Sequence, residues 1–354
     1  MQNKLMEILA CQRCLGVLEL KDALFETGNR EIIKGRLCCE RCGLDFIVEG
    51  GVPIFGIGAE NKAERNSEMD GEIEWEFTTN IQGHIAWAKR SSLRGEAIIR
   101  KCKKRLKKIN RIPKVLDVGA GVGALHSWQL SKHGFEVVAT ELCPEFLFSI
   151  DYLTEDMFFE RVVTDCTILP FRDNSFDIVF CKELIHHLEN PMKLLSEMWR
   201  VLRPNGLIVI REPCISILRN KKETLEKDSA ARMGITHHYY TYTEYLNYIK
   251  EIASNMEIDG EMITISSLNH PILSRIQKHV IKYDNIKRLL LKIQLVFVGG
   301  SVELIGVKRG VYAQEKNNRV VIPIDTQRLN LNARQIKFYR GKLIPALLEI
   351  FSEA

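Results

Sequence analysis

The feature that most constrains the fold is the segment over residues 115–123, which reads Val-Leu-Asp-Val-Gly-Ala-Gly-Val-Gly. Its apolar start has no polar alternation, which is typical of a buried parallel strand, and glycines let the backbone turn sharply close to a ligand. A segment with helical apolar spacing follows, and a second strand over residues 135–141 ends on Glu141. This order of strand, glycine-rich turn, helix, strand and acid predicts a nucleoside-binding α/β domain.

Two cofactor classes fit this pattern. The spacing of Gly119, Gly121 and Ala124 meets a permissive dinucleotide fingerprint, so a nicotinamide dinucleotide is one candidate cofactor. Asp117 favours the other class, because a carboxylate repels a pyrophosphate but attracts a sulfonium or ammonium group. We therefore predict S-adenosylmethionine as the cofactor. Glu141, about 20 residues beyond the turn, is placed to accept hydrogen bonds from ribose hydroxyls.

Further strands follow the same pattern. We expect a short third strand over residues 161–165, ending on Asp165, and a fourth strand that begins within residues 173–180. Residues 201–210 contain a Pro-Asn-Gly turn and a predicted fifth strand. The carboxyl ends of parallel strands meet at one edge of a sheet, where Asp165 could accept a hydrogen bond from an adenine amino group. We also assign Cys166 and Lys182, which directly follow strand ends, to cofactor contacts.

Residues 113–213 resemble a class I S-adenosylmethionine-dependent methyltransferase of the type 11 group, with the glycine motif, Glu141, Asp165 before Leu-Pro-Phe, His-His-Leu and Val-Leu-Arg-Pro-Asn-Gly in the family's order. The resemblance implies a doubly wound, seven-stranded Rossmann-like α/β sheet. It also implies that the methionine part of the cofactor lies against Asp117 and the turn residues Gly119, Ala120, Gly121 and Gly123. Glu141 would then contact the ribose, and Asp165 the adenine.

The N-terminus carries two Cys-x-x-Cys pairs separated by 24 residues: Cys11 with Cys14, and Cys39 with Cys42. Four thiolates at this spacing suit tetrahedral coordination, and zinc is the expected ion. Cys38 is adjacent, but only Cys39 completes the two-residue spacing. A closed site of four thiolates leaves no open position for chemistry, so we predict a structural zinc.

Residues 5–57 resemble the small zinc-ribbon family whose members activate tRNA, rRNA and translation-factor methyltransferases. The resemblance is carried by the two cysteine pairs and by Gly-Gly-Val-Pro-Ile-Phe at residues 50–55. Here the ribbon is fused to the predicted enzyme. The sequence leaves three roles open for the ribbon: it could activate the enzyme, bind its substrate, or only stabilise the fold. The ribbon is also a candidate contact surface for a protein partner.

Charge and length define the predicted domains. We expect a zinc ribbon over residues 1–58, an acidic linker over 59–88, a methyltransferase domain over 89–310 with an insertion at 267–293, and a helical extension over 311–354. Residues 89–114 are strongly basic around a helical apolar stripe, so we expect a helix with a basic outer face. That face is a candidate contact for RNA or anionic lipid, although the net charge of the chain is only +5.

The acceptor site is expected beyond the fourth and fifth strands. His187, or His186 in second place, is the candidate catalytic base, because imidazole titrates near neutrality. Glu212 and residues 237–240 (His-His-Tyr-Tyr) are further pocket candidates. The chain lacks the Asn/Asp-Pro-Pro-Phe/Tyr sequence that is expected after the fourth strand in enzymes that methylate exocyclic or amide nitrogens.

We therefore predict O-methylation of a small molecule, a lipid intermediate or a sugar. A methyltransferase acting on rRNA or tRNA bases is the alternative, and a non-catalytic binding partner with this fold is a second. No window of the sequence is apolar enough for a membrane span, and the first residues do not resemble a signal peptide. These features and the predicted thiolates lead us to expect a cytoplasmic protein.

Overall fold

The computed structural model describes residues 1–354, with gaps at 27–30, 60–61, 79–80, 107–108, 151–157, 229–230, 232–233, 256–257, 266–292, 294–295, 298, 310–318 and 353–354. The predicted insertion at residues 267–293 therefore lies almost wholly outside the described residues. Among the described helices, none is long and apolar enough to cross a membrane.

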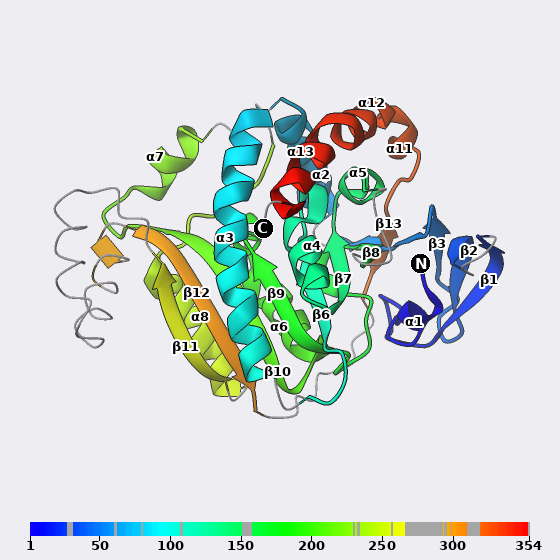
Figure 1. Ribbon diagram of the computed structural model, residues 1–354, viewed down its shortest axis with the longest axis horizontal. Coiled ribbons are helices and arrows are strands. Elements are labelled where there is room, and N and C mark those ends of the chain that lie inside the picture. The colour runs from blue at the N-terminus through cyan, green and yellow to red at the C-terminus, as the bar shows by residue number, and fades with distance from the viewer. Residues whose placement is uncertain are drawn as a thin grey trace.

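One mixed sheet forms the centre of the molecule (Figure 1). Its described strands lie in the order β1-β2-β3-β4-β8-β7-β6-β9-β10-β12-β11. The seven strands of the predicted methyltransferase sheet are β8 (Glu160–Val163), β7 (Glu136–Glu141), β6 (Lys114–Val118), β9 (Phe176–Lys182), β10 (Leu202–Ile215), β12 (Gly299–Lys308) and β11 (Ile258–Ile265). The first five run parallel, and β12 is antiparallel to both of its neighbours.

The strand order explains why the sequence pattern points to one edge. Strands β6 and β9 are neighbours, and the chain leaves β6 through the glycine turn to reach β7 on the other side. Ligands of open α/β sheets bind where the strand order reverses in this way. The topology confirms the predicted doubly wound α/β class and places the glycine turn at the switch point.

The N-terminal ribbon extends the same sheet. Strands β1 (Leu18–Phe25), β2 (Ile32–Cys39), β3 (Asp45–Glu49) and β4 (Val52–Ile54) form an antiparallel meander. Strand β4 then pairs in parallel with β8, with Ile54 opposite Val163. A separate two-stranded sheet joins β5 (Gly56–Gly58) to β13 (Val321–Pro323). The ribbon is therefore fastened to the larger domain by backbone hydrogen bonds.

Helices cover both faces of the sheet. On one face, α6 (Pro191–Val201) and α8 (Tyr242–Asn255) pack over a core that includes Leu116 and Leu194. On the other, the core around Val115 and Ile98 is covered by α3 (Ile81–Arg105), α4 (Leu125–Lys132), α5 (Pro144–Phe148) and α13 (Ile344–Ser352). Short helices complete the chain: α1 (Asn3–Met6), α7 (Lys221–Glu226), α11 (Arg328–Leu331), α12 (Ala333–Phe338) and a π-helical turn over Tyr339–Leu343.

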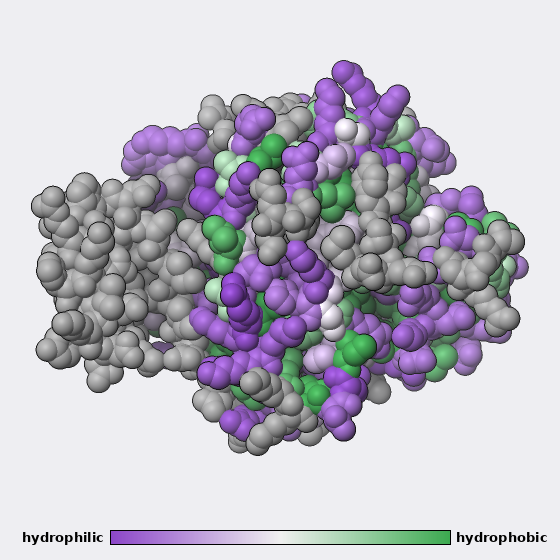
Figure 2. Space-filling view, viewed as in Figure 1, coloured by the Kyte–Doolittle hydropathy of each residue, from purple (hydrophilic) through white to green (hydrophobic). Residues whose placement is uncertain are grey.

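The segment expected to be an acidic linker, residues 59–88, is helical over most of its described length. It forms α2 (Lys62–Thr78) and the first turns of α3. The acidic composition predicted a linker, but α2 packs one side against the domain. Met69 and Ile73 of that side lie in the core, and Glu68 contacts His187. The basic end of α3 has the expected form: Cys102 and Leu106 are buried, whereas Lys103 and Lys104 are exposed. Figure 2 shows mainly hydrophilic side chains along this face.

Candidate active site and cysteine cluster

A cavity of about 410 Å³ opens at the carboxyl ends of the parallel strands. Its volume falls within the range of small-molecule sites, which is roughly 300–1,000 Å³. We call it the central cavity. The predicted site residues that line it are Asp117, Gly119, Ala120, Gly121, Glu141, Asp165, Cys166, Lys182, His186 and His187. Segments far apart in the sequence therefore meet at one place, as the topology requires.

The glycine turn leaves room for a ligand. Gly121 has φ +67°, and a Cβ built on it would meet nothing within 4 Å. That direction is open because Gly121 lines the central cavity. Gly123 differs, since its Cβ would lie 2.7 Å from Leu347 of α13. Gly123 is absent from the cavity lining, so its place in the structure favours helix packing over the predicted contact with the cofactor.

Asp117 is buried at the base of the central cavity. Its Oδ2 accepts a hydrogen bond of 2.7 Å from the Ser127 hydroxyl. Burial raises the pKa of the Asp117 carboxyl to about 6, and the hydrogen bond from Ser127 and the charge of Lys182 oppose that rise. A buried carboxylate of this kind gains most from a cationic ligand, because the interaction is poorly screened.

Glu141 and Asp165 line the cavity and also accept hydrogen bonds from the backbone of neighbouring loops. Glu141 accepts bonds from the backbone N–H groups of Gly121 (2.8 Å), Leu142 (2.6 Å) and Cys143 (3.1 Å). Asp165 accepts from the N–H and hydroxyl groups of Thr167. A carboxylate offers about four acceptor positions, so both retain capacity for a ligand hydroxyl or amino group.

The side chain of Lys182 contacts residues of α3 at the wall of the central cavity. Its ammonium group donates to the Ser91 hydroxyl at 2.6 Å and sits 4.5 Å from the centre of the Trp87 ring. Burial lowers the pKa of Lys182. Trp87 and Arg65 both line the cavity, and both come from the segment expected to be a linker. No periodic signal in that segment marked them as pocket residues.

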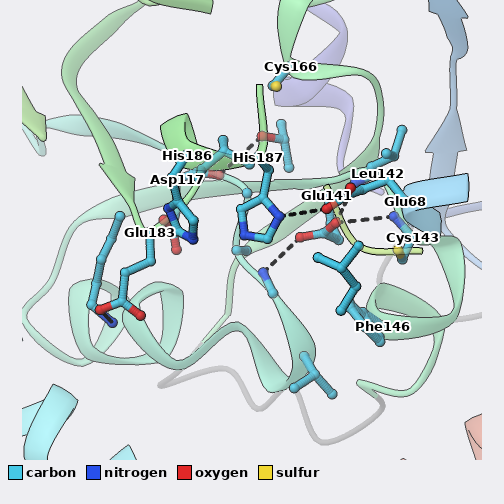
Figure 3. Close-up of a pocket in the computed structure, with 18 of the residues that line it drawn as sticks. Glu68, Asp117, Glu141, Leu142, Cys143, Phe146, Cys166, Glu183, His186 and His187 are labelled. Carbon is cyan, nitrogen blue, oxygen red and sulfur yellow. Dashed lines mark hydrogen bonds and ion pairs between the residues drawn. The ribbon is translucent and has the colours of Figure 1, made fainter. Parts of the chain in front are cut away.

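His186 and His187 lie side by side on a short turn after β9 (Figure 3), with ring centres 4.3 Å apart. Each is held by a different carboxylate. His186 Nδ1 lies 2.8 Å from Glu212 Oε2, and His187 Nδ1 lies 2.6 Å from Glu68 Oε1. Burial lowers the pKa of His187 well below its usual value, and the charges of neighbouring histidines act in the same direction.

Glu212 is fully buried and also accepts from the backbone N–H groups of Leu184 and Ile185. It therefore fixes the loop that carries both histidines. Glu212 was predicted as a pocket residue, and it acts on the cavity through His186 instead of lining it.

His237, from the predicted aromatic patch, does line the cavity. Tyr240 is buried and donates its hydroxyl to the Leu188 carbonyl at 2.6 Å.

The four cysteines of the ribbon converge, and we call them the cysteine cluster: Cys11, Cys14, Cys39 and Cys42. The Sγ atoms of Cys11 and Cys42 are 3.6 Å apart, as are those of Cys14 and Cys39. A tetrahedral zinc ion with Zn–S bonds of 2.3 Å would set sulfur atoms about 3.8 Å apart. The four thiols therefore fit a structural zinc ion, and Cys38 lies outside the cluster.

A side chain inside the first cysteine pair reaches the wall of the central cavity. Gln12 is fully buried and donates to the Gly56 carbonyl (2.9 Å) and the Thr164 hydroxyl (3.0 Å). Its Oε1 accepts from the Gly56 N–H at 2.8 Å. Thr164 lines the cavity next to Asp165, which also accepts from the Gly58 N–H. The ribbon and the cavity thus share a hydrogen-bonded boundary.

Two family models match the chain. Residues 116–210 match the methyltransferase domain model, and residues 2–51 match the Trm112p-like protein model. The chain therefore carries a methyltransferase domain of the S-adenosylmethionine-dependent class, preceded by a Trm112p-like domain. Both resemblances predicted from the sequence are confirmed.

Curated relatives match over part of their length. A phosphoethanolamine N-methyltransferase of Zea mays is 25% identical over 52% of this chain and 36% of its own length. A tocopherol O-methyltransferase of Arabidopsis thaliana is 32% identical over 33% of this chain and 34% of its own. The chain thus spans about a third of the length of these relatives.

Two solved structures are also similar. A complex containing the Haloferax volcanii Trm112 methyltransferase activator aligns at 19% identity over 64% of this chain and 97% of that chain, with a TM-score of 0.39. The Haemonchus contortus phosphoethanolamine N-methyltransferase 2 with bound S-adenosyl-L-methionine aligns at 18% identity over 60% and 53%, with a TM-score of 0.42.

Proposed function

We propose that this protein is an S-adenosylmethionine-dependent methyltransferase that methylates an oxygen of a small molecule, a lipid intermediate or a sugar. The observation that carries the proposal is the central cavity at the switch point, where the matched methyltransferase domain brings the glycine turn together with Asp117. Gly121 opens towards that cavity without a side chain, which suits close approach of a ligand to the backbone.

The charges around the cavity suit the zwitterionic methionine part of the cofactor. Asp117 supplies a buried negative charge for the ammonium or sulfonium group, and Lys182 supplies a positive charge for the carboxylate. Glu141 and Asp165 keep acceptor capacity for the ribose hydroxyls and the adenine amino group. Cys166, beside Asp165 on the cavity wall, would pack against the base.

S-adenosylmethionine supplies a methyl group that is already activated by the positive sulfur. In the transfer, the acceptor oxygen forms a bond to the methyl carbon while the carbon–sulfur bond breaks and its electron pair stays on sulfur. The acceptor also loses a proton. The chain's main contribution is to hold the two reactants in line, which can account for a large part of a barrier. His187, or His186 in second place, is the proposed acceptor of that proton, since both rings line the central cavity.

A small acceptor fits the structure better than RNA. Of the basic residues of α3, Lys89 and Arg90 follow Trp87 directly, whereas Lys103 and Lys104 lie about 24 Å along the helix from it. Phosphates bound at that far end would be remote from the site of transfer. The relatives named for phosphoethanolamine and tocopherol point towards small or lipid-like acceptors. RNA base methylation and a non-catalytic binding role remain the alternatives to be tested.

The ribbon's part in the function is structural in this proposal. It fastens the edge strand β8 and supports Thr164 through Gln12. Its exposed surface is also the candidate contact for a protein partner, as the Trm112p-like match suggests. The cytoplasmic location stays a prediction.

Calorimetric titration with S-adenosylmethionine, S-adenosylhomocysteine and NAD tests the proposal first. We expect the first two to bind and NAD not to bind. Transfer of radiolabelled methyl groups to small-molecule, lipid and RNA fractions then identifies the acceptor class. Binding of NAD alone would overturn the cofactor assignment, and label confined to RNA would overturn the acceptor. Binding without transfer to any fraction would favour the non-catalytic role.

A further inference from the structure

Three histidines gather at the wall of the central cavity. We call His186, His187 and His237 the histidine cluster. One ring nitrogen of each lies within 4.8 Å of a ring nitrogen of the other two. The centre of the His237 ring is 5.2 Å from that of His186 and 4.9 Å from that of His187. Two of the rings come from the turn after β9, and the third comes from the segment between α7 and α8.

Each ring of the histidine cluster is held by its own carboxylate through the same atom. Glu212 contacts Nδ1 of His186, Glu68 contacts Nδ1 of His187, and Asp228 contacts Nδ1 of His237 at 2.5 Å. Metal-binding histidines usually donate one ring N–H to a carboxylate in this way, which fixes the ring and leaves the other nitrogen to bind the ion. Three histidines with this arrangement in one cluster form a built site.

The backbone around the cluster is also fixed. The His238 N–H donates to the His186 carbonyl at 2.6 Å, and the Thr236 N–H donates to Glu68 Oε2 at 2.7 Å. Glu68 therefore holds both His187 and the segment that carries His237. The cluster is assembled from distant parts of the chain and is held on each side of His237, as a preorganised ligand set requires.

We propose that the histidine cluster binds a divalent transition-metal ion through the Nε2 atoms of its three rings. An ion with Zn–N bonds of 2.0–2.1 Å in tetrahedral geometry would set the ring centres about 5 Å apart, close to the distances in the structure. Imidazole suits zinc, iron, nickel and copper, and three histidines leave the fourth position of a tetrahedral zinc site open.

The open position has a consequence for the reaction, and this step depends on the proposed function. All three histidines line the central cavity, so the open position faces the place where an acceptor would lie. A metal ion lowers the pKa of an oxygen that binds to it. The acceptor hydroxyl would then release its proton to water while bound to the ion, and His187 would serve as a ligand instead of a base. The proposed acceptor class is a molecule with a hydroxyl or phosphate oxygen that can bind the ion.

The test counts metal ions on the purified full chain, which retains its ribbon zinc. The protein is dialysed against micromolar Zn²⁺, and bound zinc is measured by mass spectrometry. We expect two ions per chain for the wild type and one for His237→Ala and His186→Ala. His133→Ala is the matched control, because His133 also contacts a carboxylate, Glu96, but lies outside the cluster. It should keep two ions.

Two further measurements guard against misfolding. Asp228→Asn leaves all three ligands in place and should weaken binding of the second ion about 10–100-fold. Co²⁺ added to wild-type protein that holds only its ribbon zinc should give visible absorption without a thiolate charge-transfer band. One ion per chain in the wild type, or two in folded His237→Ala, would overturn the proposal. The metal ions are counted without S-adenosylmethionine in the sample, so the two results are independent. A chain that binds two ions but not S-adenosylmethionine would contradict only the proposed function.

Discussion

The cysteine cluster and the histidine cluster differ in what surrounds them. The cysteine cluster lies within the ribbon, with all four ligands from that one small unit. The histidine cluster lies on a cavity wall, and four separate segments supply its rings and carboxylates. A closed site of four thiolates can only hold structure, whereas three imidazoles leave a position for chemistry. We therefore expect damage to the first to reduce stability and damage to the second to reduce function.

The largest effect should follow the loss of one thiolate. Cys39→Ser removes a ligand from a buried cluster whose metal binding is coupled to folding, so we expect the free energy of unfolding to fall by several kcal/mol. Thermal unfolding with zinc analysis measures this. Cys38→Ser is the control, because Cys38 lies outside the cluster. Equal zinc content and melting temperature in the two variants would show that the cysteine cluster does not hold a structural zinc ion.

Gln12→Ala tests whether the two regions are independent. The change leaves the buried N–H and C=O groups of Gly56 without their partner, which should cost about 1–3 kcal/mol of stability. Because Gln12 also supports Thr164 at the cavity wall, we expect a smaller loss of cofactor affinity as well. Unfolding curves and calorimetry measure the two effects. An unchanged affinity would show that the ribbon supports the fold alone.

Asp117→Asn should act only on the cavity. Removing the negative charge should weaken S-adenosylmethionine binding about 10–100-fold, equivalent to roughly 1.4–2.7 kcal/mol. The amide is similar in size and can still accept from Ser127, so the melting temperature should change little. Asp45→Asn, an exposed ribbon position that contacts Arg36, is the control for loss of one charge. Equal affinities in the two variants would contradict the assigned cofactor pocket.

The smallest expected effect is a pH dependence. The pKa of Asp117 is raised to about 6, so its carboxyl is ionised above pH 6 and becomes protonated as the pH falls through that value. Binding of a cationic cofactor should therefore weaken about tenfold between pH 7.5 and pH 5. Calorimetry at several pH values measures this. Asp117→Asn should show a flatter profile, and a profile as steep as that of the wild type would assign the titration to another group.

Signals that lie close together in the sequence predicted most of the site. The glycine turn with Asp117, the strand end at Glu141 and the cysteine spacing each depend on local backbone geometry, and the structure places all of them as neighbours of a cavity or cluster. His237 was also predicted at the pocket, from an aromatic and histidine-rich segment. Sequence analysis could not predict that His237 would lie beside His186 and His187.

The parts that sequence analysis missed depend on tertiary contacts. Glu68 and Trp87 come from a charged segment without a clear apolar period, and only packing turns them towards the cavity. Glu212 was expected to line the pocket, but its role is to hold His186 and the preceding backbone. The pairing of β4 with β8 joins residues more than a hundred positions apart, and no local pattern specifies such a contact.

From that pairing we predict an order of events during synthesis. The ribbon strands β1 to β4 pair with near neighbours in the chain, so they can form once the cysteines are available and a metal is bound. Strand β8 is made later and closes a long loop when it meets β4. We therefore expect the finished ribbon to act as a template on which the edge of the larger sheet is laid down. Zinc supply during translation would then control how much of the whole chain folds.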